Sequence, residues 1–205
     1  MENKKKKIGI MGGTFNPIHY GHLLVAEDAR TYCNLDEIIF IPSGNSYMKD
    51  TSEIIDGKKR YEMVSLAIAG NTAFSISDME IKRNGHTYTY ETLEELNKIY
   101  PDTDFYFILG ADNLFTIEKW KYADKIMQNC TLIVASRDEK DKQDLTQKAN
   151  SLFKSFHATI EILPERKIDL SSTEIRKKIR ENKSVIYMTP QSVISYINKN
   201  ALYQS

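Results

Sequence analysis

The sequence has few cysteines and no long apolar run. Its only two cysteines, Cys33 and Cys130, lie far apart and belong to no Cys-x-x-Cys or Cys/His cluster. This argues against a disulfide scaffold and a zinc site, and it predicts core thiols in a reducing compartment. No apolar run approaches the ~18 residues of a membrane span. Only four apolar residues follow the lysine run at 4–7, too few for a signal-peptide core. We therefore expect a cytoplasmic protein without a membrane partner.

The sequence also lacks an excess of charge of either sign. Lys plus Arg and Asp plus Glu both number 28 among 205 residues, so the formal net charge is zero. Such a chain has no overall attraction to nucleic acid, and any anion site must be local. The composition is 41% apolar and 27% charged, and no repeat, linker or low-complexity segment interrupts it. We expect a single domain over residues 1–205.

Short apolar runs alternate with segments of helical periodicity. Strands are expected at 8–11, 37–42, 74–77, 105–109, 130–135 and 159–163. Helices are expected at 21–34, 57–70, around 93–99, at 113–120, at 173–180 and near the C-terminus, and the charge-rich stretch 138–144 is expected to be a surface loop. This alternation predicts an α/β fold with a doubly wound parallel sheet and right-handed crossovers. Residues that follow the strands then meet at one edge of the sheet.

The sequence contains neither G-x-x-x-x-G-K-[ST] nor G-x-G-x-x-G, but it has another glycine-rich turn between a strand and a helix. Residues 12–22 are Gly-Gly-Thr-Phe-Asn-Pro-Ile-His-Tyr-Gly-His. Glycines let backbone N–H groups approach an anion closely, and the free N–H groups of the following helix add a positive dipole end. His19 and His22 lie three positions apart and share a helix face, so both can point at one bound group. A tight turn with structural histidines is the alternative, but it leaves the complete pattern unexplained.

This stretch resembles the G-G-T-F-D-P-x-H-x-G-H signature of the nucleotidyltransferase superfamily that includes nicotinate-nucleotide adenylyltransferase. Asn16 stands where that family usually has Asp, and an amide keeps a turn or cap role before Pro17 but not a charge. The resemblance implies a Rossmann-like nucleotidyltransferase fold. It also implies that ATP binds at the residues of this motif, which are Gly12, Gly13, Thr14, Phe15, His19 and His22.

A second motif lies near the other end of the chain, where residues 170–176 are Leu-Ser-Ser-Thr-Glu-Ile-Arg. The spacing Ser171-x-x-Glu174 is a capping box, which fixes the start of a helix. The helix N–H groups, the hydroxyls of Ser172 and Thr173 and the Arg176 guanidinium then point toward one spot and form an anion cradle. A capping box with only a structural role is the alternative. The segment resembles the I-S-S-T-x-I-R motif that binds the triphosphate in relatives.

The most apolar expected strand is followed by Gly110-Ala111-Asp112. A glycine permits close approach of a ligand, and a carboxylate accepts hydrogen bonds from hydroxyl groups, so this pair suits a ribose. The G-x-D of the family at this place resembles an adenosine-ribose site. The alternative is that Asp112 only caps the next helix.

Further segments resemble the parts of the family that bind a pyridine nucleotide. The segment 83–93 is similar to R-x-x-x-S-Y-T-x-x-T-L, with Thr87 in the Ser position, and a helix cap is the alternative role for Thr87. Trp120, the only tryptophan, has charged neighbours that indicate a surface-facing ring, and an aromatic at this place in relatives stacks on the pyridine. A cation at Lys121 near the pyridine carboxylate favours nicotinate over nicotinamide. The expected pyridine-nucleotide residues are Ser43, Thr87, Trp120, Lys121 and Arg137.

Two of the expected cations follow strands. Lys49 matches the basic end of the P-P-H-K/R loop of the family, although Tyr47 and Met48 replace the rest of that loop. Arg137 stands where relatives often carry an arginine near phosphates. For both residues, a solvated surface cation is the alternative.

The resemblance spans nearly the whole chain and implies transfer of AMP from ATP to the 5′-phosphate of nicotinate mononucleotide, which gives deamido-NAD and pyrophosphate in NAD biosynthesis. A substrate phosphate oxygen attacks the α-phosphorus in line, so the protein supplies positioning and charge stabilisation rather than a covalent nucleophile. The expected catalytic donors are His19, His22, Lys49 and Arg176. Mg²⁺ is expected to enter with ATP, held mostly by phosphates and water, and no metal site made by protein ligands alone is expected.

Three rival functions and the oligomeric state stay open at this point. A sister enzyme could transfer AMP to nicotinamide mononucleotide or to phosphopantetheine. A module that binds ATP without turnover is a third reading, since Asn16 and the altered loop at 43–49 depart from the family pattern. The sequence does not decide between a monomer and a homo-oligomer.

Overall fold

The computed structural model describes residues 5–46, 53–136, 141–167 and 169–204. Within them, six parallel strands form one sheet in the order β4-β2-β1-β6-β7-β8. Strands β3 and β5 form a separate two-stranded parallel sheet. The expected doubly wound parallel sheet is confirmed. The strands are β1 (Lys6–Gly13), β2 (Glu37–Pro42), β3 (Asn45–Ser46), β4 (Phe74–Ile76), β5 (His86–Thr87), β6 (Thr103–Gly110), β7 (Thr131–Ala135) and β8 (Ile160–Ile162).

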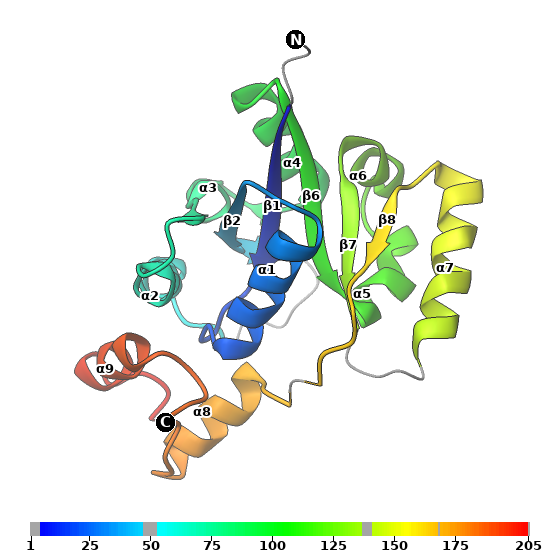
Figure 1. Ribbon diagram of the computed structural model, residues 1–205. Helices are drawn as coiled ribbons and strands as arrows, with labels where there is room; N and C mark the ends of the chain where they lie inside the picture. Colours follow the sequence, from blue (N-terminus) through cyan, green and yellow to red (C-terminus); the bar gives the residue numbers. More distant parts are fainter. Residues whose placement is uncertain (1–4, 47–52, 137–140, 168, 205) are drawn as a thin grey trace.

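Helices connect the strands and cover both faces of the sheet (Figure 1). They are α1 (Tyr20–Tyr32), α2 (Gly57–Ile68), α3 (Met79–Lys82), α4 (Thr89–Ile99), α5 (Ala111–Thr116), the 3₁₀ turn η1 (Ile117–Lys119), α6 (Ala123–Asn129), α7 (Asp141–Phe156), α8 (Ser172–Arg180) and α9 (Gln191–Lys199). From residue 141 onward, the expected surface loop at 138–144 is wrong, because α7 begins there. Leu145 and Leu152 are fully buried seven positions apart, so this helix has an apolar stripe and its charges face water. Among the described residues, none of the helices combines the length and the apolarity that crossing a bilayer requires.

Alternate residues of each central strand pack into two separate apolar layers. In β1, Ile8 and Ile10 belong to the layer under α4, α5, α6 and α7, whereas Met11 belongs to the layer under α1, α2 and α9. In β2, Ile39 and Phe40 divide between the two layers in the same way. Strands buried on both faces are continuous apolar runs, which is why the sequence marks them clearly.

The two central strands, β1 and β6, lie side by side, and the chain leaves them in opposite directions. From β1 it continues to β2 and β4, and from β6 it continues to β7 and β8. Such a reversal creates a crevice at the carboxyl ends of the two strands, which is where open α/β sheets bind ligands. Met11 of β1 is paired with Ile108 of β6 close to this edge.

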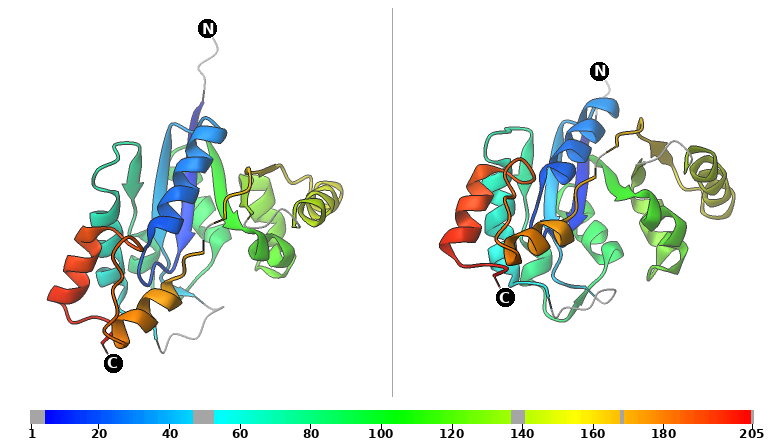
Figure 2. Two further views of the ribbon diagram at one scale, coloured as in Figure 1. Left: turned by 60° about the horizontal axis from the view of Figure 1, so that its bottom comes forward. Right: turned by 90° about the horizontal axis from the view of Figure 1, so that it is seen from below.

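The C-terminal segment lies at the same end of the sheet. Figures 1 and 2 show α8 below the carboxyl ends of the central strands and α9 next to α2. The Thr189 hydroxyl donates a hydrogen bond of 2.7 Å to the Ile18 carbonyl, and the Tyr20 N–H donates one of 3.0 Å to the Met188 carbonyl. These bonds attach the segment between α8 and α9 to the turn that precedes α1.

Candidate active site

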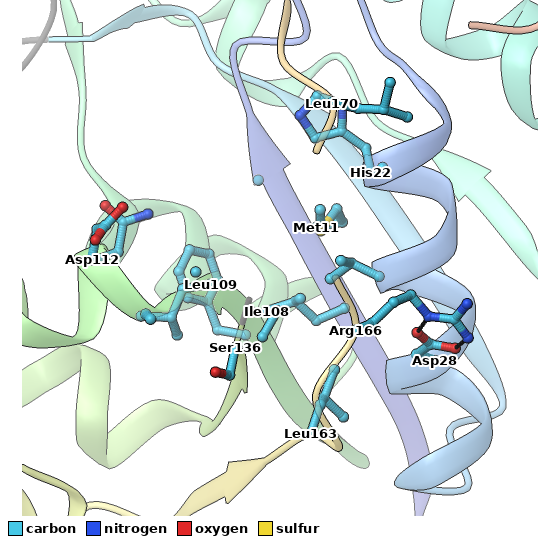
Figure 3. A pocket seen from close by; sticks show the side chains of 18 of the residues that line it. Met11, His22, Asp28, Ile108, Leu109, Asp112, Ser136, Leu163, Arg166 and Leu170 are labelled. Carbon is cyan, nitrogen blue, oxygen red and sulfur yellow. Dashed lines mark hydrogen bonds and ion pairs between the residues drawn. The ribbon is translucent and has the colours of Figure 1, made fainter. Parts of the chain in front are cut away.

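A cavity of about 450 Å³ opens at the carboxyl ends of β1 and β6. In Figure 3, His22 and Asp28 on α1 line one side of it, and Leu109 and Asp112 line the other. Arg166 reaches the cavity from the chain after β8 and forms an ion pair with Asp28. The volume lies within the usual range for small-molecule sites, and the cavity occupies the crevice that the strand order creates.

The two histidines of the glycine-rich stretch lie next to each other at this cavity. Their rings stack with centroids 3.7 Å apart and planes 27° from parallel. His22 Nδ1 accepts a hydrogen bond of 3.3 Å from the backbone N–H of His19, the residue that precedes α1. An Nδ1 that accepts a hydrogen bond leaves the ring proton on Nε2, so His22 keeps a donor on its other edge. His19 is 5% exposed, and both rings line the cavity.

The remaining residues of the stretch have different positions. Gly12 lines the cavity, but the Phe15 ring is 2% exposed and contacts His22 edge-on at 5.1 Å. A Cβ on Gly13 would lie 2.9 Å from the Phe15 ring, so a glycine is needed for this close packing. The buried Phe15 ring therefore packs against His22, and its expected contact with ATP stays a prediction, as do those of Gly13 and Thr14.

Sequence reasoning missed Arg60, which is hydrogen-bonded to the glycine-rich stretch, to the loop after β2 and to the segment before α2. Its guanidinium donates hydrogen bonds to three backbone carbonyls, those of Thr14 at 2.8 Å, Ser43 at 2.7 Å and Ile55 at 3.0 Å. Arg60 is 3% exposed, and this burial lowers its pKa. Because its partners are backbone groups, they need no particular residue type, and the sequence carried no signal of the role.

The two distant motifs meet at the turn before α1. Ser172 Oγ donates a hydrogen bond of 2.8 Å to the Pro17 carbonyl, and Arg176 Nη1 donates one of 3.0 Å to the Asn16 carbonyl. As the capping pattern predicts, Ser171 accepts a hydrogen bond from the Glu174 N–H and α8 begins at the next residue. The N-terminal end of α8 and the histidine turn thus form one connected structure.

Asn16 is a buried connector rather than a ligand group. Its side-chain oxygen accepts hydrogen bonds from the Tyr203 hydroxyl at 2.8 Å and from the Ile55 N–H at 3.4 Å, and its NH₂ group donates to the Glu53 carbonyl at 2.9 Å. The site needs an acceptor and a donor on one side chain, which an amide provides and an ionised carboxylate does not. The expected turn role of Asn16 is therefore realised through contacts with two other segments.

The proposed ribose pair lies at the start of α5. Gly110 precedes the helix, and Asp112 is an exposed residue of its first turn that lines the cavity. The N-cap of α5 is Gly110 and not Asp112, so the alternative in which Asp112 only caps the helix is wrong. Its ribose contact stays a prediction.

The residues expected to bind the pyridine nucleotide are placed less directly. Thr87 lies buried in β5, and Tyr88 rather than Thr87 is the N-cap of α4, so the helix-cap alternative for Thr87 is wrong. Ser43 follows β2 and donates a hydrogen bond of 2.8 Å from its N–H to the Gly13 carbonyl.

The other expected residues are a hydroxyl and two cations. Thr173, expected to bind the triphosphate, is exposed in the first turn of α8. Lys49 and Arg137 fall outside the described residues.

Trp120 does not face the surface as its charged neighbours suggested. It is partly buried, packs edge-on against Phe107 at 6.3 Å and lines the cavity, and among the described residues no group accepts a hydrogen bond from its Nε1–H. Lys121 lies over the Tyr88 ring, with Nζ 3.9 Å from the ring centroid. Trp120 and Lys121 therefore connect the cavity to the segment that begins at Thr87.

Comparisons with known proteins agree with this geometry. Residues 10–178 match the family described as cytidylyltransferase-like. A protein of Lachnoclostridium phytofermentans named "Probable nicotinate-nucleotide adenylyltransferase" is 46% identical over 198 residues, which cover 97% of this chain and 99% of that protein. One of the same name from Clostridium botulinum (strain Eklund 17B) is 43% identical over 199 residues, which cover 97% and 98% of the two proteins. The solved structure of a Plasmodium falciparum nicotinic acid mononucleotide adenylyltransferase complexed with NaAD has the same fold, with a TM-score of 0.80, 24% identity and 97% of each chain covered. By the family match and these full-length relatives, the chain belongs to the nicotinate-nucleotide adenylyltransferases within the cytidylyltransferase-like family.

Proposed function

We propose that this protein transfers AMP from ATP to nicotinate mononucleotide, which yields deamido-NAD and pyrophosphate in NAD biosynthesis. The observation that supports this most directly is the junction of the two motifs. Arg176 and Ser172 are bonded to the turn that presents the stacked histidines, and those histidines line a nucleotide-sized cavity. A polyphosphate placed there can contact both ends of the chain.

In the proposed reaction, an oxygen of the nicotinate mononucleotide 5′-phosphate attacks the α-phosphorus of ATP. The bond between the α-phosphorus and the bridging oxygen to the β-phosphorus breaks, and its electrons leave with pyrophosphate. His22 Nε2–H, His19, the Gly12 N–H and Arg176 stabilise charge on the phosphoryl oxygens. Removing one such donor typically raises the activation barrier by about 3 kcal/mol. Lys49 is proposed as a further donor by its position in the sequence.

The other parts of the two substrates are assigned from the resemblance to the family together with the positions of the residues. We assign the ATP ribose to Asp112 with Gly110, and the triphosphate to the N-terminal end of α8 with Ser172 and Thr173. For the pyridine nucleotide, support comes from the position of Trp120 at the cavity and from the contact of Lys121 with Tyr88. The remaining proposed contacts are Ser43, Thr87 and Arg137.

Mg²⁺ is proposed as part of the MgATP substrate. Across the described residues, no group of three or more His, Cys, Asp or Glu side chains is arranged to hold a metal ion. Coordination by the phosphates and water fits such a site better than a resident metal. The cytoplasmic location and the single domain stay predictions, and the oligomeric state stays open.

Pyrophosphate release measured with MgATP and each acceptor in turn tests the function. We expect turnover with nicotinate mononucleotide, and little with nicotinamide mononucleotide or phosphopantetheine. Binding of ATP without pyrophosphate release from any acceptor would instead indicate a non-catalytic module.

A matched pair of variants tests the histidine assignment. His22→Asn should lose most of kcat while ATP binding falls less, because the ring donor acts mainly on the developing charge. His157→Asn alters an exposed histidine after α7 and should retain wild-type turnover. Equal turnover in both variants would refute the assignment.

A further inference from the structure

Glu80 lies in the short helix α3, outside the cavity, and its carboxylate joins two loops. The Thr92 hydroxyl donates a hydrogen bond of 2.8 Å to Glu80 Oε1. The carboxylate also accepts hydrogen bonds from the Gly44 backbone N–H and the Thr87 side chain. Gly44 belongs to the loop after β2, and Thr87 belongs to β5. One side chain thus bonds to both segments that lead to the proposed pyridine-nucleotide site.

The loop after β2 rests directly on this residue. A Cβ built on Gly44 would lie 2.8 Å from Thr87 Cγ2 and still closer to the Glu80 carbonyl oxygen, so only glycine fits. Immediately after Gly44, β3 pairs with β5 through Asn45 and Ser46. The small sheet and the Glu80 carboxylate therefore fix the same two segments to each other.

The partners of Glu80 explain why a carboxylate is needed. Arg83 donates a hydrogen bond of 3.1 Å to Thr92 Oγ1, so the hydroxyl of Thr92 directs its own O–H toward Glu80. The Gly44 N–H is a donor as well, so the groups around Glu80 offer protons. A glutamine at this position has only one acceptor oxygen. Its NH₂ group would face at least one of these donors, and that hydrogen bond would be lost. Burial raises the pKa of the Glu80 carboxyl, so holding the charge there costs stability.

We propose that Glu80 is a positioning residue for the acceptor half of the site. Its carboxylate holds the Ser43–Ser46 loop and the start of α4 in the arrangement that binds the pyridine nucleotide, and this inference rests on the proposed function. The link to the cavity continues from Thr87 to Tyr88, whose ring contacts Lys121 beside Trp120. Glu80 does not line the cavity beside His22, so its effect should fall on the acceptor and not on ATP.

Steady-state kinetics of Glu80→Gln test this assignment. We expect KM for nicotinate mononucleotide to rise about tenfold, with kcat and KM for ATP within about twofold of wild type. Thr92→Val removes one donor to the carboxylate and should change the same constant in the same direction. The matched control is Glu95→Gln, because Glu95 pairs with the same Arg83 at 2.6 Å and, among the described residues, forms no hydrogen bond with 43–46 or 86–88. An unchanged KM for the acceptor in Glu80→Gln, or an equal rise in both KM values, overturns the proposal.

Amide hydrogen exchange in the ligand-free protein separates this inference from the proposed function. Peptides covering residues 40–46 and 86–88 should exchange faster in Glu80→Gln than in wild type or Glu95→Gln. If wild type fails to use nicotinate mononucleotide, the proposed function fails while the exchange result still decides whether Glu80 joins the loops. Unchanged exchange in folded Glu80→Gln overturns the joining role. Should that variant not fold, Thr92→Val carries both measurements, and wild-type values in it contradict the proposal.

Discussion

Arg176 on α8 donates a hydrogen bond of 3.0 Å to the backbone carbonyl of Asn16, which lies 160 positions earlier in the sequence. The same guanidinium forms an ion pair with Glu53 at 3.0 Å. One nitrogen of the guanidinium, Nη1, is therefore bonded to the histidine turn, and the other, Nη2, contacts a carboxylate. A bound polyphosphate would take the place of Glu53 while the bond to the turn persists.

The double role of Arg176 predicts that lysine cannot replace it. A lysine has one ammonium group and lacks the planar fork that bonds to a carbonyl and an anion at once. We expect Arg176→Lys to lower kcat/KM about 100-fold, with circular dichroism unchanged. Arg180→Lys is the control, because Arg180 lies one turn later and approaches the same Glu53 at 3.6 Å. Equal losses in the two variants would show that only general positive charge on α8 matters.

Glu53 should compete with ATP for Arg176. Its side chain is 59% exposed, so the ion pair is screened by solvent and is worth only about 0.2–1 kcal/mol. Glu53→Gln keeps the backbone carbonyl that accepts from Asn16 and removes the charge. We expect ATP to bind up to about fivefold more tightly in calorimetric titrations. Weaker binding would mean that Glu53 holds Arg176 in its productive position.

The sheet and its crevice could be predicted from the sequence because their signals are local. Ile39 and Phe40 pack into opposite layers, so both must be apolar, and a continuous apolar run marks the strand. The contact of Ser172 and Arg176 with the turn before α1 could also be predicted. Parallel strands bring their carboxyl ends to one edge, and both motifs lie beside that edge.

Other features depend on contacts that no local pattern reveals. Trp120 stands among Lys119 and Lys121, whose side chains are exposed, and only its packing on Phe107 turns the indole inward. Arg60 and Glu80 act as connectors through distant backbone and hydroxyl groups. Neither residue belongs to a motif, so the three-dimensional structure was needed to find them.

Tyr203 should make stability fall at alkaline pH. Burial raises the pKa of its hydroxyl above the ordinary value of 10.0. The unfolded chain therefore loses this proton at lower pH than the folded chain. The stabilisation is complete below pH 10 and is lost as pH rises from there toward the folded-state pKa.

Tyr203→Phe isolates this contribution. Loss of the hydrogen bond to Asn16 should lower the free energy of unfolding by about 1 kcal/mol at pH 8. Above pH 10, the free energy of unfolding of wild type should fall more steeply with pH than that of the variant. The difference in slope should be about 1.4 kcal/mol per pH unit. Urea denaturation at pH 8 and pH 11 measures both effects. Tyr187→Phe is the control, since Tyr187 is 88% exposed, and parallel pH curves for wild type and Tyr203→Phe would contradict the prediction.

Trp120 should report acceptor binding, because it is the only tryptophan in the chain and lines the cavity. If its ring stacks on the pyridine, nicotinate mononucleotide should quench its fluorescence to saturation. Trp120→Phe keeps an aromatic face and should retain a KM for the acceptor near that of wild type. Trp120→Leu keeps apolar bulk without a π face, and we expect its KM to rise about fivefold, as for a stacking contact worth about 1 kcal/mol. Equal KM values for the Trp120→Phe and Trp120→Leu variants would show that Trp120 only fills space beside Phe107. The pyridine would then have to bind at another wall of the cavity.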